Sequence, residues 1–266
     1  MYRLIAIDMD GTLLNKKKEI SNRCKEDIRK LKEKGLSVVL ATGRPFDGIL
    51  RYIYELNLLD EKDFMVTYNG ALVQNTNADK VLNKRPLSLD SYKELYTVSK
   101  ELDVNIHALT ESSVLTPKNN PYTLVESTIN QIPIIEVPVE DIDSSTSIIK
   151  VMFIDDPKRL DAIIPLIPKW VKEKYSILRS SPIFLEFLDK GVDKGVGVSL
   201  IAKQLGIEPE EVICIGDAGN DIAMIQYAGL GVAMGNATDE VKSVADYITL
   251  SNEEDGVAHI IEKFML

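Results

Sequence analysis

The feature that most constrains the fold is a short apolar run, Leu4–Ile7, that leads directly into two aspartates, Asp8 and Asp10. An unbroken apolar run bounded by a glycine, here Gly11, is typical of a strand buried on both faces. Two neighbouring carboxylates repel each other, and burying either of them without a partner costs free energy. Such a pair persists if a cation lies between the carboxylates or if one of them is protonated. The alternative is a solvated turn at the end of the strand.

Apolar strands alternate with amphipathic helices at both ends of the chain. This alternation predicts an α/β fold with a Rossmann-like, three-layer core built on a parallel sheet. Pro45 is well placed to open the second helix. After the opening strand, strands are expected at 36–41, 64–67, 211–216, 230–234 and 247–250, and helices at 21–34, 45–57, 195–205, 218–228, 238–245 and 253–264.

The middle of the chain, residues 85–186, is more polar and is punctuated by proline, which predicts a separate α+β domain inserted after the third strand. Residues 1–84 and 187–266 then form one core that is split in the sequence. Within the insert, helices are expected at 89–102, 122–131 and 157–164, and strands at 104–109, 134–137, 148–154 and 184–188.

Three apolar strands end in polar residues, namely Asp8, Thr42 and Asp217. In open parallel sheets ligands bind at the carboxyl ends of the strands, so these residues are candidates for one site. The loop Gly216–Asp221 adds two acids and an amide that would face Asp8 and Asp10. Such an oxygen-rich cage suits Mg²⁺. The alternative is an ordinary strand-to-helix loop in which Asn220 or Asp221 caps the helix.

Two further segments fit an anion site. Thr42-Gly43-Arg44 offers a hydroxyl and backbone N–H groups where a helix is expected to begin. Lys194 lies at the beginning of another expected helix, where its charge opposes the helix dipole unless an anion or carboxylates offset it. Taken alone, Thr42 could simply cap a helix and Lys194 could be a solvated loop residue.

Charge and cysteine content restrict the partners and the compartment. The formal net charge is −10 and the isoelectric point about 4.9, which argues against nucleic acid or an anionic membrane as a partner. Cys24 and Cys214 lie in apolar patterns and are expected to be buried thiols in a reducing compartment. Because the first residues lead directly into a core strand and no apolar run approaches membrane-spanning length, a cytoplasmic protein is expected.

Four motifs in this order resemble those of the haloacid dehalogenase-like hydrolases. They are DMDGT at 8–12, TGRP at 42–45, KG at 194–195 and GDAGND at 216–221. The insert between the second and third motifs, together with TYNGA at 67–71, resembles the Cof-type group with its larger α+β cap. Within that group, KVMFIDDP at 150–157 and LEFLDKGVDKG at 185–195 resemble the YidA-type sugar phosphatases most closely.

The resemblance implies a Mg²⁺-dependent phosphatase of small phosphorylated metabolites, with sugar phosphates as the first candidates and the cap as the specificity domain. Asp8 would be the nucleophile, and Asp10 would be the acid and base. The implied metal ligands are Asp8, the Asp10 carbonyl and Asp217. The implied phosphate-binding groups are the Met9 and Gly43 backbone, Thr42, Lys194 and Asn220, with Arg44 and Asp221 as supporting residues.

Two other functions are compatible with the same residues. A phosphosugar mutase would return the phosphoryl group to the substrate instead of transferring it to water. A regulatory module would carry a phosphorylated Asp8 as a signal, although such a module needs neither Asp10 nor a hundred-residue insert. The sequence leaves open the physiological substrate, the cap residues that select it, the strand order of the cap and the oligomeric state.

Overall fold

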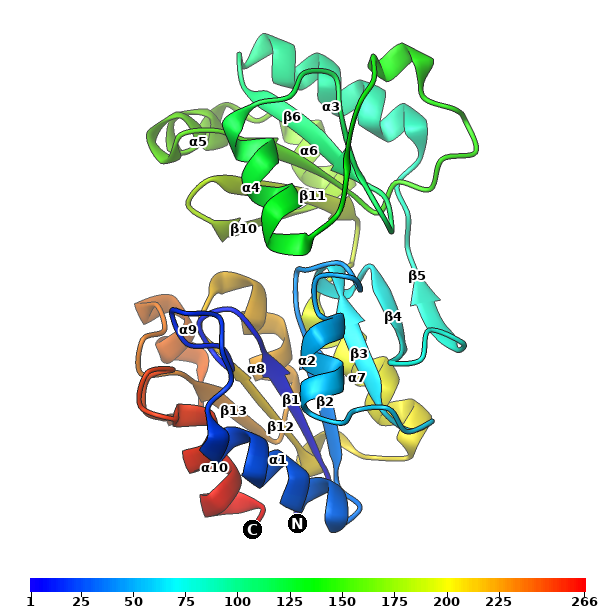
Figure 1. The fold of residues 1–266 in the computed structure, drawn as a ribbon. Coiled ribbons are helices and arrows are strands. Elements are labelled where there is room, and N and C mark those ends of the chain that lie inside the picture. Colours follow the sequence, from blue (N-terminus) through cyan, green and yellow to red (C-terminus); the bar gives the residue numbers. More distant parts are fainter. The chain divides into compact units, whose positions relative to one another are not determined.

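The chain divides by its internal contacts into two units in the computed structural model, which describes residues 1–266 (Figure 1). Unit 1 contains Met1–Gly43, Leu50–Lys84 and Asp193–Leu266. Unit 2 contains Arg44–Ile49 and Arg85–Val192. The predicted boundary at 186/187 falls inside strand β11, Phe184–Asp189, whereas the contacts divide the chain after Val192.

Unit 1 is built on an eight-stranded sheet with the order β14-β13-β12-β1-β2-β3-β4-β5. The six strands from β14 to β3 run parallel, and β4 and β5 extend the sheet antiparallel. This arrangement confirms the expected α/β class, while the two short antiparallel strands were not predicted. The strands are β1 (Leu4–Asp8), β2 (Ser37–Ala41), β3 (Phe64–Thr67), β4 (Leu72–Asn75), β5 (Val81–Lys84), β12 (Val212–Gly216), β13 (Leu230–Ala233) and β14 (Tyr247–Ile248).

The register of the parallel strands brings their polar ends to one edge of the sheet. Ile7 of β1 pairs with Leu40 of β2 on one side and with Ile215 of β12 on the other. The residues that follow, including Asp8, therefore leave the sheet at the same level. Leu4 and Ala6 pack in an apolar cluster with α7 (Lys194–Leu205) and α8 (Ile222–Tyr227). Because strand side chains alternate, Asp8 points to this same face.

The helices of unit 1 begin and end where their sequences supply capping groups. Helix α1, Asn22–Glu33, begins after Ser21, whose hydroxyl accepts the backbone N–H of Cys24, and ends before Gly35 at φ +74°. The remaining helices are α2 (Leu50–Glu55), α9 (Asp239–Val244) and α10 (Gly256–Phe264), with 3₁₀ turns η1 (Tyr68–Gly70), η4 (Pro209–Glu211) and η5 (Gly219–Asp221). None of the helices is both long and apolar enough to cross a membrane.

The helix expected to open at Pro45 begins five residues later, at Leu50. The intervening segment, Arg44–Ile49, instead forms turns and belongs to unit 2. There the Arg44 guanidinium donates to the carbonyl of Gly48, at 3.2 Å. A Cβ at Gly48 would overlap the side chain of Asn130, so close packing within unit 2 competes with helix formation here.

Unit 2 has a six-stranded sheet with the order β10-β11-β9-β6-β7-β8, antiparallel except between β7 and β8. Its strands are β6 (Asn105–Leu109), β7 (Val114–Thr116), β8 (Ile134–Glu136), β9 (Lys150–Ile154), β10 (Tyr175–Ser181) and β11. Its helices are α3 (Leu89–Glu101), α4 (Pro121–Asn130), α5 (Pro157–Ile163) and α6 (Lys169–Lys174), with 3₁₀ turns η2 (Val139–Asp141) and η3 (Ile164–Leu166).

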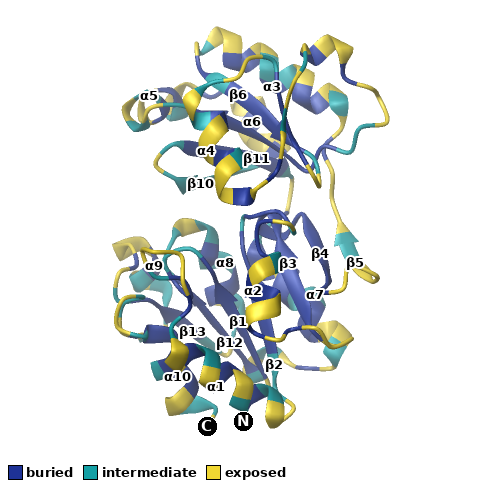
Figure 2. Ribbon diagram, in the orientation of Figure 1, coloured by how far each residue is buried: buried dark blue, intermediate teal, exposed yellow.

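The apolar core of unit 2 lies on one face of its sheet. Phe153 and Phe187 from neighbouring strands pack with ring centroids 4.5 Å apart, and Tyr175 meets Phe187 edge to face. Figure 2 shows that buried residues dominate most strands of both sheets, whereas the helices also have exposed faces. Each unit therefore has its own core, as expected for a separate inserted domain.

Removing the aromatic ring at the centre of unit 2 should destabilise this unit strongly. Phe187→Ala is expected to lower the free energy of unfolding by about 3–5 kcal/mol, because the cavity in the core collapses only partly. Guanidinium unfolding followed by circular dichroism measures the change. The matched control is Tyr54→Ala on the exposed side of α2, which should stay within about 0.5 kcal/mol of the wild type. Equal stability of Phe187→Ala and wild type would contradict the described core.

Candidate active site

A buried lysine forms the centre of the polar edge of unit 1. Lys194 is the first residue of α7, and its ammonium lies 2.6 Å from Asp8 Oδ1 and 2.6 Å from Asp221 Oδ1. The side chain has no exposed surface. Burial lowers the pKa of Lys194, but Asp221 and Asp8 outweigh burial, so this pKa lies above its usual value. The lysine is therefore charged, and the two carboxylates offset its unfavourable position at a helix N-terminus.

A third carboxylate joins the two that contact Lys194. Oxygen atoms of Asp8, Asp217 and Asp221 all lie within 4.8 Å of one another. Asp217 follows β12 and accepts a hydrogen bond from the Thr12 hydroxyl, at 3.1 Å. Gly11 makes this approach possible, because its φ is +89° and because a Cβ at this position would overlap the Asp217 carboxylate.

The carboxylate cluster carries more negative charge than the lysine can compensate. With all groups ionised, three carboxylates and one ammonium have a formal charge of −2. Burial and the neighbouring Asp221 raise the pKa of Asp217 to about 6. The same two causes, against the opposing effect of Lys194, raise the pKa of Asp8 well above its ordinary value. The carboxylate oxygens are thus in an environment that favours binding a proton or a cation.

The residues present fit a divalent cation. Asp8 Oδ2 is buried and has no hydrogen-bond partner, while Oδ1 of the same carboxylate contacts Lys194. A hard cation such as Mg²⁺ binds oxygen ligands and would neutralise the excess charge. Asp8 and Asp217 are better placed for this role than Asp221, whose Oδ2 already accepts the backbone N–H groups of Asp217 and Ala218, both at 3.0 Å.

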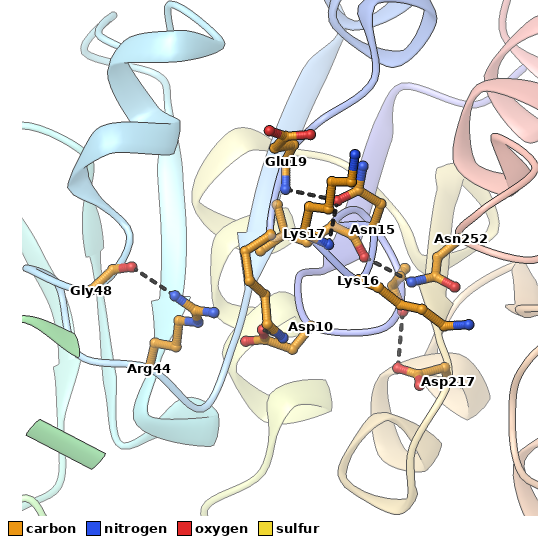
Figure 3. A network of polar contacts seen from close by, with 12 residues as sticks. Asp10, Asn15, Lys16, Lys17, Glu19, Arg44, Gly48, Asp217 and Asn252 are labelled. Carbon is orange, nitrogen blue, oxygen red and sulfur yellow. Dashed lines mark hydrogen bonds and ion pairs between the residues drawn. The ribbon is translucent and has the colours of Figure 1, made fainter. Parts of the chain in front are cut away.

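The sequence predicts that Asp10 faces the acids of the loop Gly216–Asp221, whereas the cluster of three carboxylates does not include Asp10. Strand β1 ends at Asp8, and the chain then turns through Gly11, so Asp10 does not continue the extended strand. Its carboxylate instead lies 2.6 Å from the ammonium of Lys18. Figure 3 shows the neighbouring loop, in which the Asn15 side chain accepts the backbone N–H groups of Lys17 and Glu19.

The predicted phosphate-binding residues, unlike the supporting residue Arg44, all belong to unit 1. Thr42 lies directly after β2, and its N–H donates to the carbonyl of Val66, at 2.8 Å. Asn220 from η5 donates its side-chain N–H to Asn69 Oδ1, at 2.9 Å. Met9 is fully buried at the end of β1. Arg44 belongs to unit 2 and is not among the residues that unit 1 brings together.

Sequence reasoning missed two polar residues at this edge. The residues expected to form the site do not include Lys18, although it pairs with Asp10. Asn69 was noted only as part of the TYNGA motif, although its side chain is fully buried beside Thr42 and Asn220. The Asn-Gly pair lies one residue after the third parallel strand, and this position is a signal for Asn69, because that strand ends at the same edge of the sheet. No comparable signal identified Lys18.

Comparisons with known proteins give consistent similarities over the whole chain. A family model described as haloacid dehalogenase-like hydrolase matches residues 5–261. YxeH, a candidate phosphatase of Bacillus subtilis, is 45% identical over 268 residues, which cover 100% of this chain and 99% of YxeH. A haloacid dehalogenase-like hydrolase from Bacteroides thetaiotaomicron has a TM-score of 0.88 at 36% identity, over 100% of both chains. The subclass IIB sugar phosphatase BT4131 has a TM-score of 0.81 at 28% identity, over 98% of each chain.

Binding of Mg²⁺ at the carboxylate cluster can be tested without any substrate. At about 100 times its Kd, the ion should raise the melting temperature of the wild type by roughly 5–10 °C. Asp217→Asn should lose most of this shift, because the variant lacks one of the two best-placed carboxylates. Asp239→Asn, an exposed carboxylate on α9, is the control and should keep the full shift. Differential scanning calorimetry with Mg²⁺ or EDTA measures the change in melting temperature. An undiminished shift in Asp217→Asn would rule out this site.

Proposed function

Because this chain belongs to the haloacid dehalogenase-like hydrolases, we propose that it is a Mg²⁺-dependent phosphatase of small phosphorylated metabolites. Sugar phosphates are the first candidate class of substrate. The observation that carries the proposal is the Asp8 carboxylate. One of its oxygens is fixed by Lys194, and the other is buried without a partner. This arrangement supports a nucleophile held in one orientation next to positive charge.

In the proposed reaction a carboxylate oxygen of Asp8 attacks the phosphorus atom, and the bond from phosphorus to the ester oxygen breaks. Asp10 supplies the proton that the departing alkoxide takes up. A water molecule then attacks the phosphorus of the aspartyl phosphate, Asp10 accepts the proton of that water, and the bond from phosphorus to Asp8 breaks to release inorganic phosphate. Covalent catalysis of this kind divides one difficult displacement into two easier ones.

The charges of the site explain how an anionic carboxylate can approach an anionic phosphate. Mg²⁺ held by Asp8, Asp217 and the Asp10 carbonyl would supply positive charge beside the phosphate oxygens. Lys194 supplies a fixed ammonium, and the Thr42 hydroxyl, the Met9 and Gly43 backbone N–H groups and the Asn220 amide supply hydrogen bonds. Groups that are in place before the reaction stabilise the charge of the transition state without reorganising. Acid–base help from Asp10 adds about 10²–10⁴-fold.

The polar face of the unit 2 sheet supports a leaving group rich in hydroxyls. Lys150 lies 3.1 Å from Glu186 and 3.6 Å from Glu126, and all three side chains are buried. Lys150 and Glu186 alternate along their strands with residues of the apolar core, so they project from the opposite face of the sheet. Ammonium and carboxylate groups bind sugar hydroxyls as donors and acceptors.

We therefore assign the selection of the leaving group to the inserted segment 85–186, acting as a cap. The name of BT4131, a sugar phosphatase of similar fold, supports the same substrate class. The more specific YidA-type activity stays a prediction. The cytoplasm is the proposed compartment, supported by two free and buried thiols, Cys24 and Cys214.

Asp8→Asn tests the nucleophile. The variant should hydrolyse p-nitrophenyl phosphate and sugar phosphates only at the background rate, because the amide cannot form the aspartyl phosphate. Phosphate release is measured with Mg²⁺ or EDTA, and circular dichroism checks the fold. Asp239→Asn is the control and should keep wild-type turnover. In the wild type, isomerised sugar phosphate without free phosphate would support the mutase. A long-lived wild-type phosphoprotein without turnover would support the regulatory module.

Glu186→Gln tests the proposed selection of sugars. The ratio of kcat/KM for sugar phosphates to kcat/KM for p-nitrophenyl phosphate should fall about tenfold, because a charge-assisted hydrogen bond to the leaving group is lost. Glu140→Gln, an exposed carboxylate of the same unit, is the matched control and should keep the ratio. A parallel loss for both substrates would show that Glu186 has only a structural role.

A further inference from the structure

The turn that follows β3 has an unusual backbone. Tyr68, Asn69 and Gly70 form η1, and all three have positive φ values, +49°, +55° and +104°. Residues other than glycine rarely adopt such values, although asparagine tolerates them better than most. A run of three in a fully buried turn persists only when the surrounding contacts hold it in place. This backbone therefore directs attention to what the turn contacts.

Asn69 bonds to two different segments of the proposed phosphate site. Its backbone N–H donates to the carbonyl of Thr42, at 2.9 Å. Its side-chain oxygen accepts the amide N–H of Asn220, also at 2.9 Å. Thr42 follows β2 and Asn220 lies in the loop after β12, so one residue connects loops that are 178 positions apart in the sequence.

Two glycines give the turn the space that it needs. A Cβ at Gly43 would lie only 3.0 Å from the Asn69 side-chain nitrogen and 3.2 Å from its oxygen. A Cβ at Gly70 would overlap the carbonyl of Asp193, the residue that caps α7 just before Lys194. The turn is therefore packed tightly against three segments that carry proposed phosphate-binding groups.

We propose that Asn69 is a positioning residue that orients the Asn220 amide and keeps it in register with the Thr42 loop around the transferring phosphoryl group. This inference rests on the proposed phosphatase function. One N–H of the Asn220 amide is used by Asn69, which fixes the plane of the amide and the direction of its second N–H. A donor aligned in advance stabilises the transition state more than the bound substrate. Loss of Asn69 should therefore affect kcat more than KM.

Asn69→Gly is the most direct variant. Glycine adopts the positive φ without strain and keeps the backbone N–H that bonds to Thr42, so only the side-chain amide is removed. We expect kcat to fall about tenfold while KM changes less than threefold. Asn57→Gly is the matched control, because Asn57 also has a positive φ, +52°, but is exposed at the end of α2. It should keep both kinetic constants within twofold of wild type.

A double-mutant cycle with Asn220→Ala distinguishes positioning from a general loss of structure. If Asn69 acts through Asn220, the double variant should be no more than twofold slower than Asn220→Ala alone. Two losses that multiply in the double variant would overturn the proposal, as would an Asn69→Gly enzyme with kcat within twofold of wild type.

Titration of inorganic phosphate in the presence of Mg²⁺ gives a readout that does not need turnover. Asn69→Gly should weaken phosphate binding about threefold, and Asn57→Gly should not weaken it. If the wild type hydrolyses no phosphate ester, the proposed function fails, and this titration alone decides the role of Asn69. Unchanged phosphate binding in Asn69→Gly would then reject that role.

Discussion

The structure of the site depends on one buried ammonium between two buried carboxylates. Lys194 links the end of β1, through Asp8, to the loop after β12, through Asp221. Removing one partner from a buried ion pair typically costs about 3–5 kcal/mol, because the remaining charge is left without compensation. Stability alone does not explain such a buried ion pair, because apolar residues can fill the same space at a lower cost in free energy. Its value is that it fixes the orientation of Asp8.

Close approach of acidic groups is possible because the neighbouring backbone has no side chains in the way. A Cβ at Gly11 would overlap the Asp217 carboxylate, and a Cβ at Gly216 would overlap the side chain of Asp221. The parallel register brings β1 and β12 to the same level, and the two glycines let the acids converge there. The cluster therefore results from main-chain geometry, and the charge that it gathers favours a divalent cation.

The sequence predicted the features that follow from local patterns and from strand order. Apolar runs ending in Asp8, Thr42 and Asp217 placed these residues at one edge, because parallel strands share their direction. It did not predict that Asp10 pairs with Lys18, since that contact depends on a turn through Gly11. The predicted start of α2, at Pro45, was also wrong, because the helix begins at Leu50. A proline after a strand satisfies the local rule for a helix start, but the packing of Arg44–Ile49 in unit 2 overrides it.

Helix α4 shows most clearly that a pattern can locate a helix without predicting which of its faces is buried. The sequence predicts a helix at 122–131, and the structure has one at Pro121–Asn130. The side chains that it buries are polar, namely Thr123, Glu126 and Asn130, whereas Leu124, Val125 and Ile129 are exposed.

A helix that buries polar side chains and exposes apolar ones is stable only if its buried face contacts polar partners. Glu126 has such a partner in Lys150, which also contacts Glu186 from β11. Polar groups inside a small domain cost more free energy than an apolar core, so their presence needs a reason beyond folding. Recognition of a polar, hydroxyl-bearing leaving group is a reason that fits both the proposed reaction and the chemistry of these three side chains.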